Sequence, residues 1–388
     1  MAIHTPNIDE IKASIDATLD NLQSPLRELN REIWSNPETA YQEHKAHDTI
    51  YAFLESQGCT VTRHAYGLDT SFEATCGSGG RLINFNAEYD ALPGIGHACG
   101  HNLITTSSVA AFLALSALLK KYGIPGRTQL LGTPAEENGG GKTKLIENGA
   151  YKGVDISLMA HAGPKKLFPG VDSDGVAGVL MNARKEIHCD FTVSAYNNVS
   201  VLRQQMQPDE RVHVAFTETP TVANVIPERT KAYWQVRSPT LKGLDRLVGR
   251  VRNCIEAGAL SSGCRVDIVE DQLYTDIKIN DTLCGRYQTH MARYGRNITK
   301  SHDKVLTGSS DIGNVSYLVP TLHAMFAVTD QEGSFLHHSS FAIAAGTDTA
   351  HEEAVVVGKS LAIVGWEMLT DEGHFQTAKK QWEIAILE

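Results

Sequence analysis

The sequence has no excess of basic residues, no cysteine framework and no clean apolar run of bilayer length. Its 35 Lys and Arg residues are outnumbered by 45 Asp and Glu residues, which gives a net charge of −10 and a pI near 5.9. This balance argues against nucleic acid and anionic membranes as partners. We find no apolar stretch long and clean enough to cross a bilayer, no internal repeat and no low-complexity segment.

The seven cysteines are scattered along the chain. An odd number without tight spacing is typical of reduced thiols rather than of a disulfide framework. The segment 1–16 carries acids where a secretory signal would have basic and then apolar residues, so we expect a cytoplasmic protein. The length of 388 residues exceeds one ordinary core, which predicts two domains.

The most informative stretch is residues 86–102, NAEYDALPGIGHACGHN. An apolar strand precedes it, and the apolar segment 103–119, which has no Pro or Gly, predicts a buried helix after it. Asp90, Cys99 and His101 thus lie where a strand leads into a helix, the place where ligands bind in open α/β sheets. Carboxylate, thiol and imidazole together suit zinc or a similar metal. The alternative is a buried cysteine beside a hydrogen-bonded histidine.

A second stretch, TPAEENGGGK at 133–142, follows another apolar strand. Its adjacent acids Glu136 and Glu137 are costly to bury unpaired. One can bind a metal while the other acts as general base on a water whose pKa the metal brings to about 7. The alternative is a solvated acidic turn, against which the glycines argue because they let the backbone approach a ligand closely.

Strands and helices alternate up to about residue 165, which predicts an α/β fold with a mostly parallel, doubly wound sheet. Strand ends bring Asp90, Glu136 and Glu137, and His161 to one edge of this sheet. From about residue 183 the pattern becomes that of a small α+β unit. We therefore predict a metal-binding catalytic domain of residues 1–182 and 273–388, with an inserted domain of residues 183–272.

Several helix and strand boundaries can be predicted closely enough to be compared with a structure. We predict a helix break near Ser24 and Pro25, a strand ending on His161 and a terminal helix at 351–369. Within the inserted domain we predict strands at 186–193 and 264–269, with a helix at 197–206.

Six motifs occur in order: EYDALPGIGHACGHN, GTPAEENGGGK, MAHAGP, NVIP, GSSDIGN and LHHSSF. Together they resemble the aminoacylase/carboxypeptidase-G superfamily of two-metal amidohydrolases. Within it they are most similar to the branch holding aminobenzoyl-glutamate hydrolases, plant auxin-conjugate hydrolases and an intracellular β-alanyl dipeptidase. The resemblance spans nearly the whole chain and implies an enzyme that cleaves an amide bond in a small N-acyl amino acid or dipeptide with metal-bound hydroxide.

The resemblance also implies individual roles. Glu136 is the general acid/base, and Asp90 orients the metal ligands. Cys99 bridges two divalent ions, with zinc preferred to manganese or cobalt. The remaining ligands are His101, Glu137, His161 and His337.

Two ligand choices rest on spacing within the family pattern. His337 is preferred to His338 because the family places its histidine four residues before an aromatic residue, here Phe341. Glu88 stands where other branches carry a metal-binding histidine, and we assign it as a supporting residue and not a ligand.

The inserted domain resembles the family's lid, which also forms a homodimer. Asn224, in NVIP, and Arg237 match positions near the substrate, and an arginine can hold a carboxylate bidentately. Gly308 and Ser309 belong to a loop whose amides face the substrate's carboxylate end. For Arg237 the alternative is an exposed strand residue.

One segment departs from the family pattern. After the first lid strand, relatives carry a turn with a histidine, a proline-tryptophan-glycine stretch and the start of a long helix. Here Asp190-Phe191-Thr192 runs straight into Val193. We therefore expect a frayed strand, a short helix and no lid histidine.

This departure leaves two alternatives to the metal-dependent hydrolase. One is a metal-containing relative that binds acylated amino acids without turnover because its lid is incomplete. The other is a thiol enzyme with Cys99 as nucleophile, although nearby imidazoles and Glu137 make this sulfur a better metal ligand.

Overall fold

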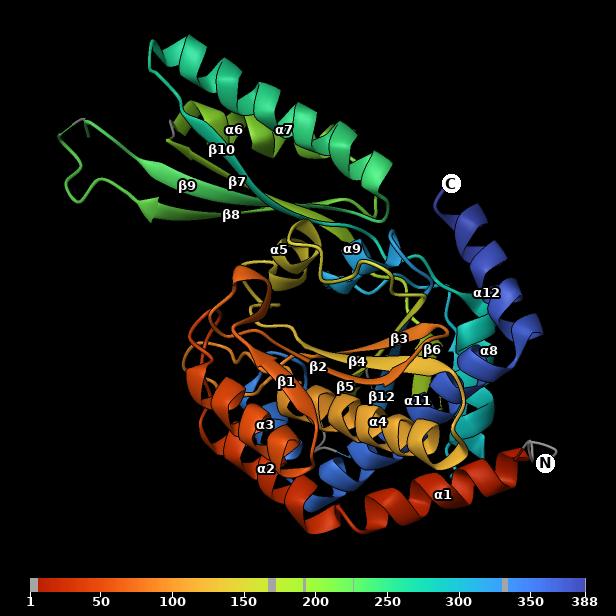
Figure 1. The fold of residues 1–388 in the computed structure, drawn as a ribbon. Helices are drawn as coiled ribbons and strands as arrows, with labels where there is room; N and C mark the ends of the chain where they lie inside the picture. The colour runs from red at the N-terminus through yellow and green to blue at the C-terminus, as the bar shows by residue number, and fades with distance from the viewer. Residues whose placement is uncertain (1–5, 167–171, 191–192, 226, 330–333, 388) are drawn as a thin grey trace. The chain divides into compact units, whose positions relative to one another are not determined.

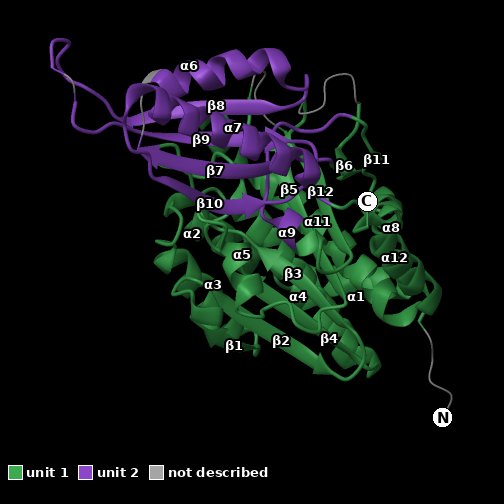
Figure 2. Ribbon diagram, turned by 90° about the horizontal axis from the view of Figure 1, so that it is seen from above, with its two compact units in different colours: residues 1–179, 278–303, 315–388 green, residues 180–277, 304–314 purple. Residues whose placement is uncertain are grey.

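The computed structural model describes residues 6–166, 172–190, 193–225, 227–329 and 334–387. The chain divides into two compact units (Figure 2). Unit 1 comprises Met1–Val179, Lys278–Asp303 and Val315–Glu388, and unit 2 comprises Leu180–Ile277 and Lys304–Asn314. Unit 2 is thus formed by two segments inserted into the sequence of unit 1.

Figure 1 labels the helices of the described residues except α10. They are α1 (Ile8–Asp20), α2 (Gln23–Ser35), α3 (His44–Ser56), α4 (His101–Tyr122), α5 (Gly141–Glu147), α6 (Val193–Leu202), α7 (Leu241–Ser262), α8 (Asp281–Ala292), α9 (Ile312–Ser316), α10 (Ser339–Ala345), α11 (Asp348–Thr370) and α12 (Glu372–Ala385).

The strands of the described residues form one sheet in each unit. They are β1 (Thr60–Arg63), β2 (Phe72–Ser78), β3 (Leu82–Ala87), β4 (Gly126–Gly132), β5 (Ile156–Pro164), β6 (Gly175–Gly178), β7 (Ala183–Asp190), β8 (Arg211–Glu218), β9 (Lys231–Ser238), β10 (Ile268–Tyr274), β11 (Ile298–Ser301) and β12 (Thr321–Val328).

The sheet of unit 1 has the order β1-β2-β4-β3-β5-β12-β6-β11. Its four central strands β4, β3, β5 and β12 are parallel, whereas β1 and β2 at one edge and β6 next to β12 pair antiparallel. The predicted mostly parallel α/β sheet is therefore confirmed. One predicted boundary is wrong, because β5 continues past His161 to Pro164 in register with β12.

Helix α4 forms the centre of unit 1. It packs against β3, β4 and β5, and α11 lies alongside it (Figure 1). By length and composition α4 could cross a membrane, contrary to our prediction that no segment could. In the structure 89% of its most apolar window is buried within the protein, as expected of a core helix.

The close contact between α4 and α11 requires glycine at position 358. A Cβ atom at Gly358 would lie 2.7 Å from Ala110 Cβ and 2.7 Å from the Ser107 carbonyl oxygen. We therefore expect Gly358→Ala to lower the free energy of unfolding by about 1–3 kcal/mol, because overpacking outweighs the higher helix propensity of alanine. The measurement is denaturant unfolding of the purified variant.

The matched control is Gly285→Ala in α8, where the nearest atom to the added Cβ is Lys300 Cε at 3.7 Å. Only helix propensity changes at this position, so the free energy of unfolding of this variant should rise by up to about 1 kcal/mol. Equal effects at the two positions would contradict the packing argument.

The amino-terminal helices show how local signals set boundaries. Asn7 caps α1, accepting the Glu10 backbone N–H while the Glu10 side chain accepts the Asn7 N–H. The predicted break near Ser24 and Pro25 is misplaced, because both residues lie in the first turn of α2. Proline is tolerated there because its missing N–H would have no intrahelical partner.

Unit 2 has an antiparallel sheet of order β10-β7-β9-β8, with α6 and α7 packed on one face. Its core is built around Trp234, Ile187 and Leu247. Our strand prediction at 264–269 is wrong by about four residues, since β10 starts at Ile268. Our strand and helix limits at 193 and 197 are also wrong, because α6 already begins at Val193.

The segment in which we predicted a shortened lid has the expected short helix but not the expected frayed strand. β7 pairs with β9 from Ala183 through Asp190. α6 has 10 residues, against 22 in α7. The junction itself, Phe191 and Thr192, lies outside the described residues.

Candidate metal and catalytic site

Neighbouring strands of unit 1 bring polar side chains to one edge of the sheet. Glu88 and Asp90 follow β3, Glu136 and Glu137 follow β4, His161 lies in β5, and His337 follows β12. Because β4, β3, β5 and β12 are parallel neighbours, these side chains, far apart in sequence, share the carboxyl edge.

The loop before α4 adds Cys99 and His101. Gly100 between them has a φ of +79°, and a Cβ there would lie 3.1 Å from Ala162 Cβ and 3.1 Å from Phe341 Cε1. Glycine therefore lets the loop turn tightly into the first residue of α4, His101. His97 takes no part in the cluster, because its Nε2 meets the Ile33 carbonyl oxygen at 3.0 Å.

The Cys99 sulfur belongs to two groups of candidate ligands. Cys99, His101 and His161 form one group, and Cys99, Glu137 and His337 form the other. Within each group the ligand atoms lie within 4.8 Å of one another, and Cys99 Sγ is 3.4 Å from His161 Nε2. The structure thus brings all five predicted ligands together in unit 1.

His337 is held by a strained backbone. Its φ is +63°, which is rare for a residue with a side chain, and its N–H donates to the Ala98 carbonyl at 2.9 Å. Its Nε2 lies 3.4 Å from Glu137 Oε2. His338 instead caps α10, with Nδ1 accepting the Ser340 N–H. The geometry therefore favours His337 over its neighbour as a ligand.

Asp90 joins two parts of the cluster. Its Oδ1 lies 3.0 Å from His101 Nδ1, and its Oδ2 accepts the Glu137 backbone N–H at 3.0 Å. His101 Nε2 is thereby turned toward the other ligands. We expect Asp90→Asn to weaken zinc binding by about 10–100-fold, because an amide oxygen holds the imidazole less firmly. Competition with a chromophoric chelator measures this affinity.

The control for this variant is Asp155→Asn. Asp155 Oδ2 also accepts a backbone N–H, that of Leu82 at 2.8 Å, but at the opposite end of β3. This change should leave zinc affinity unaltered. Wild-type affinity in Asp90→Asn would contradict the orienting role of Asp90.

The loop carrying the two acids is anchored by Glu43, to which we assigned no role from the sequence. Ala135, with a φ of +59°, donates its N–H to Glu43 Oε1 at 2.9 Å. Burial and nearby Asp90 raise the pKa of Glu43 to about 7. A Cβ at Gly141 would lie 1.7 Å from the Pro134 carbonyl oxygen. This third glycine thus serves close packing of the loop on itself.

The electrostatics of the cluster suit a cation. Burial raises the pKa of the Cys99 thiol well above its usual range and Glu137 adds to this, which is the opposite of an activated nucleophile. Burial lowers the pKa of His161 to about 4, leaving a neutral imidazole. Burial raises the pKa of Glu137, but His337 and His101 outweigh it and bring it to about 2.

Unpartnered polar atoms give a direct test of fit to a metal. Glu88 Oε2, His101 Nε2 and Glu137 Oε1 are buried without a hydrogen-bond partner among the described residues. Buried polar atoms are rarely left so. Together with Cys99 they supply the sulfur, nitrogen and oxygen donors that zinc and similar ions accept. The residues present therefore fit a metal centre.

The predicted substrate-binding residues lie in unit 2. Arg237 donates to the Thr307 carbonyl at 2.9 Å, to Ser309 Oγ at 3.0 Å and to Gln235 Oε1 at 3.0 Å. Gly308 stands between these loop residues, and its carbonyl accepts the Asn182 N–H. Arg237 and the loop thus form one network. Asn224 is exposed on the connection between β8 and β9.

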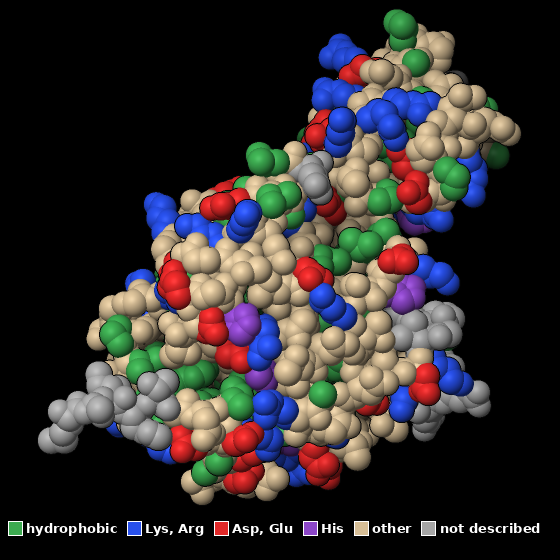
Figure 3. Space-filling model, turned by 90° about the vertical axis from the view of Figure 1, so that its right-hand side faces the viewer, with side chains coloured by type: hydrophobic (Ala, Val, Ile, Leu, Met, Phe, Trp, Pro, Cys, Tyr) green, Lys and Arg blue, Asp and Glu red, His purple; other side chains and the backbone are tan. Residues whose placement is uncertain are grey.

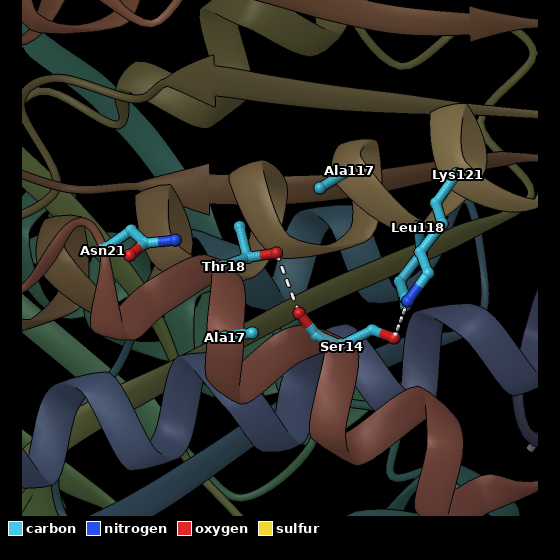
Figure 4. Close-up of a pocket in the computed structure, with 7 residues that line it drawn as sticks. All are labelled: Ser14, Ala17, Thr18, Asn21, Ala117, Leu118 and Lys121. Carbon is cyan, nitrogen blue, oxygen red and sulfur yellow. Dashed lines mark hydrogen bonds between the residues drawn. The ribbon is translucent and has the colours of Figure 1, made fainter.

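One surface hollow of unit 1 carries no comparable chemistry. A hollow between α1 and α4 (Figure 4) contains no acid, histidine or cysteine, and Lys121 Nζ there donates to Ser14 Oγ at 2.6 Å. Its lining residues are Ser14, Ala17, Thr18, Asn21, Ala117, Leu118 and Lys121. Acidic and basic side chains are interspersed on the face shown in Figure 3.

Comparison with known families gives this geometry its context. The model of peptidase family M20/M25/M40 matches residues 84–355, which include every member of the cluster but not Glu43, the anchor of its acidic loop. The chain belongs to this peptidase family. It is therefore a hydrolase that acts on peptide bonds, and the resemblance read from its motifs is confirmed. The non-catalytic alternative is not favoured by this family match.

Two curated relatives of this peptidase match nearly its whole length. The mouse Xaa-Arg dipeptidase is 35% identical over 412 residues, covering 98% of this chain and 94% of the relative. A subunit of the p-aminobenzoyl-glutamate hydrolase of Escherichia coli is 23% identical, covering 96% and 95%. Because the first alignment is longer than the 388 residues of this enzyme, the mouse protein carries residues that this enzyme lacks.

A solved structure has the same fold. The Bacillus subtilis protein described as a dinuclear metal-binding peptidase of the M20 family superposes with a TM-score of 0.68 at 21% identity. The superposition covers 90% of this chain and 99% of the other.

Proposed function

We propose that this peptidase hydrolyses the amide bond of a dipeptide or small N-acyl amino acid with two divalent ions, zinc being preferred to manganese or cobalt. The observation that carries the proposal is the Cys99 sulfur shared by two candidate ligand groups, with Glu136 Oε2 3.8 Å from His101 Nε2. One ion would be held by Cys99, His101 and His161, and the other by Cys99, Glu137 and His337.

When bound, such ions polarise the substrate carbonyl and lower the pKa of a water toward about 7. Glu136 takes the proton from the attacking water and passes it to the leaving nitrogen. Its burial, with only 6% of its surface exposed, keeps bulk water from competing for that proton. Asp90 keeps His101 oriented throughout, because it contacts Nδ1 and leaves Nε2 facing the ligand cluster.

The substrate class is supported by the relatives. The mouse and human proteins at 35% and 33% identity are both named Xaa-Arg dipeptidases. We therefore propose dipeptides with a basic carboxyl-terminal residue as the first substrates. In this proposal the Arg237 guanidinium binds the substrate carboxylate, since its fork geometry matches two oxygens. The homodimer formed through unit 2 and the cytoplasmic location remain predictions.

The test is an activity screen of the purified chain with added Zn²⁺ or Mn²⁺. The panel comprises dipeptides ending in arginine or lysine, β-alanyl dipeptides, p-aminobenzoyl-glutamate and N-acetyl amino acids. We expect amine release from at least one basic dipeptide, loss of turnover on chelation and recovery on adding metal. A chain that binds two ions but hydrolyses no member of the panel would contradict the proposal.

A further inference from the structure

A fully buried ion pair lies next to the candidate ligands. Glu88 follows β3, and Lys142 lies in the first turn of α5 after the three glycines. Both side chains have 0% exposure, and Lys142 Nζ lies 2.5 Å from Glu88 Oε1. Removing two charges from water is costly, and such pairs are often no more stabilising than apolar residues of similar volume. A contribution to stability alone therefore does not explain why these two charges are buried.

The second oxygen of Glu88 faces the ligand cluster. Glu88 Oε2 lies 3.5 Å from His101 Nε2 and has no hydrogen-bond partner among the described residues. Glu88, His101 and Glu136 also form a third group whose ligand atoms lie within 4.8 Å of one another. A carboxylate serving only as a partner for Lys142 would have no reason to leave this oxygen bare beside an imidazole nitrogen.

The surrounding charges show what Lys142 does. The Lys142 ammonium is 2.5 Å from Glu88 Oε1, so it lies against the carboxylate oxygen that does not face His101. Lys142 thus compensates Glu88 while holding one carboxylate oxygen away from the cluster. The pair presents a negative end toward His101 and a positive end away from it.

We infer that Glu88 and Lys142 act together as a positioning pair that sets the metal affinity of the site. Lys142 fixes the carboxylate so that Oε2 stays directed at His101 Nε2, beside which an ion would be held. The Glu88 carboxylate adds negative charge beside His101, and the Lys142 ammonium partly offsets that charge. The inference rests on the proposed metal centre, and it goes beyond the five ligands because it gives a role to two residues outside that set.

Zinc affinity, measured by competition with a chromophoric chelator, tests the inference independently of turnover. Glu88→Gln removes the carboxylate charge that faces both His101 and the Lys142 ammonium, and we expect zinc binding to weaken by at least about 10-fold. Lys142→Met should bind zinc more tightly than wild type but melt at a lower temperature without metal. The double variant, with neither charge, should bind zinc more weakly than Lys142→Met and more tightly than Glu88→Gln.

A control separates this effect from general destabilisation. Glu367 on α11 accepts hydrogen bonds from Arg286 at 2.6 and 2.7 Å. This pair lies near the start of β3, because Arg81, which precedes β3, donates to the carbonyl of the next residue, Met368. Glu367→Gln should lower the melting temperature and leave zinc affinity unchanged. If Glu88→Gln does not fold, the zinc affinities of Lys142→Met and of the double variant are compared instead, and their difference tests the inference.

The inference is overturned if Lys142→Met and the double variant bind zinc equally tightly, whatever their stabilities. A purely structural pair predicts that result. The proposed function would fail differently, because a chain without a metal centre would bind no zinc even as wild type.

Discussion

We expect Glu136→Gln to lower kcat/KM by about 10²–10⁴-fold and to leave the metal content of the chain unchanged. The amide cannot accept the proton of the attacking water, so the chemical step loses its base. None of the five proposed ligands is changed, and Glu136 lies outside both groups that share Cys99. Steady-state kinetics on the best substrate of the panel, with metal content determined on the same sample, measure both effects.

The neighbouring acid provides the matched control. Glu137 Oε2 lies 3.4 Å from His337 Nε2, and Glu137 belongs to a group containing Cys99. Glu137→Gln should therefore lose metal as well as turnover. Normal turnover in Glu136→Gln, or loss of metal from it, would contradict the assignment of the general base.

We expect Cys99→Ser to lose both ions, because the same sulfur belongs to both candidate ligand groups. A serine hydroxyl stays protonated and is a poor ligand for a borderline metal. We expect the zinc affinity to fall by more than about 100-fold, beyond the range typical of a residue that only orients a ligand. Chelator competition and elemental analysis of the variant measure the loss.

Cys76→Ser is the control for this variant. Cys76 is half-buried on β2 and belongs to no ligand group among the described residues. It should keep wild-type zinc affinity. If Cys99→Ser retained one ion at wild-type affinity, the sulfur would serve a single ion and the bridging role would be wrong.

The sequence was most informative where the chemistry is local. Cys99 and His101 are two residues apart, and Glu136 and Glu137 are adjacent, so a short motif carries each pair. Parallel strands then bring such motifs together, because successive carboxyl ends share one edge. This is why the pattern of strands alone predicted that Asp90, the two acids and His161 meet at one edge, whereas His337 was assigned from the family resemblance.

Contacts between side chains far apart along the chain could not be predicted from the sequence. Glu88 and Lys142 are 54 residues apart, and no local pattern reveals that their side chains meet. A lysine directly after three glycines in a buried loop was the available signal. The bounds of β10 were misplaced for another reason. This strand lies at the edge of its sheet with polar, exposed residues such as Glu270, so its pattern lacks the clear alternation of a core strand.

Backbone strain was equally invisible in the sequence. Ala135 and His337 both adopt positive φ values, although neither residue type favours them. Hydrogen bonds to Glu43 and to the Ala98 carbonyl hold these conformations. Strain of this kind is maintained where surrounding structure fixes it, and here it flanks the two acids and the last histidine.

X-ray diffraction with anomalous scattering at the zinc edge, on crystals of the zinc-loaded chain, tests the central claim most directly. The account predicts two zinc ions per chain, both bonded to the Cys99 sulfur at about 2.3 Å, with His101 and His161 on one and Glu137 and His337 on the other. A single ion, or two ions of which neither is bonded to that sulfur, would contradict it.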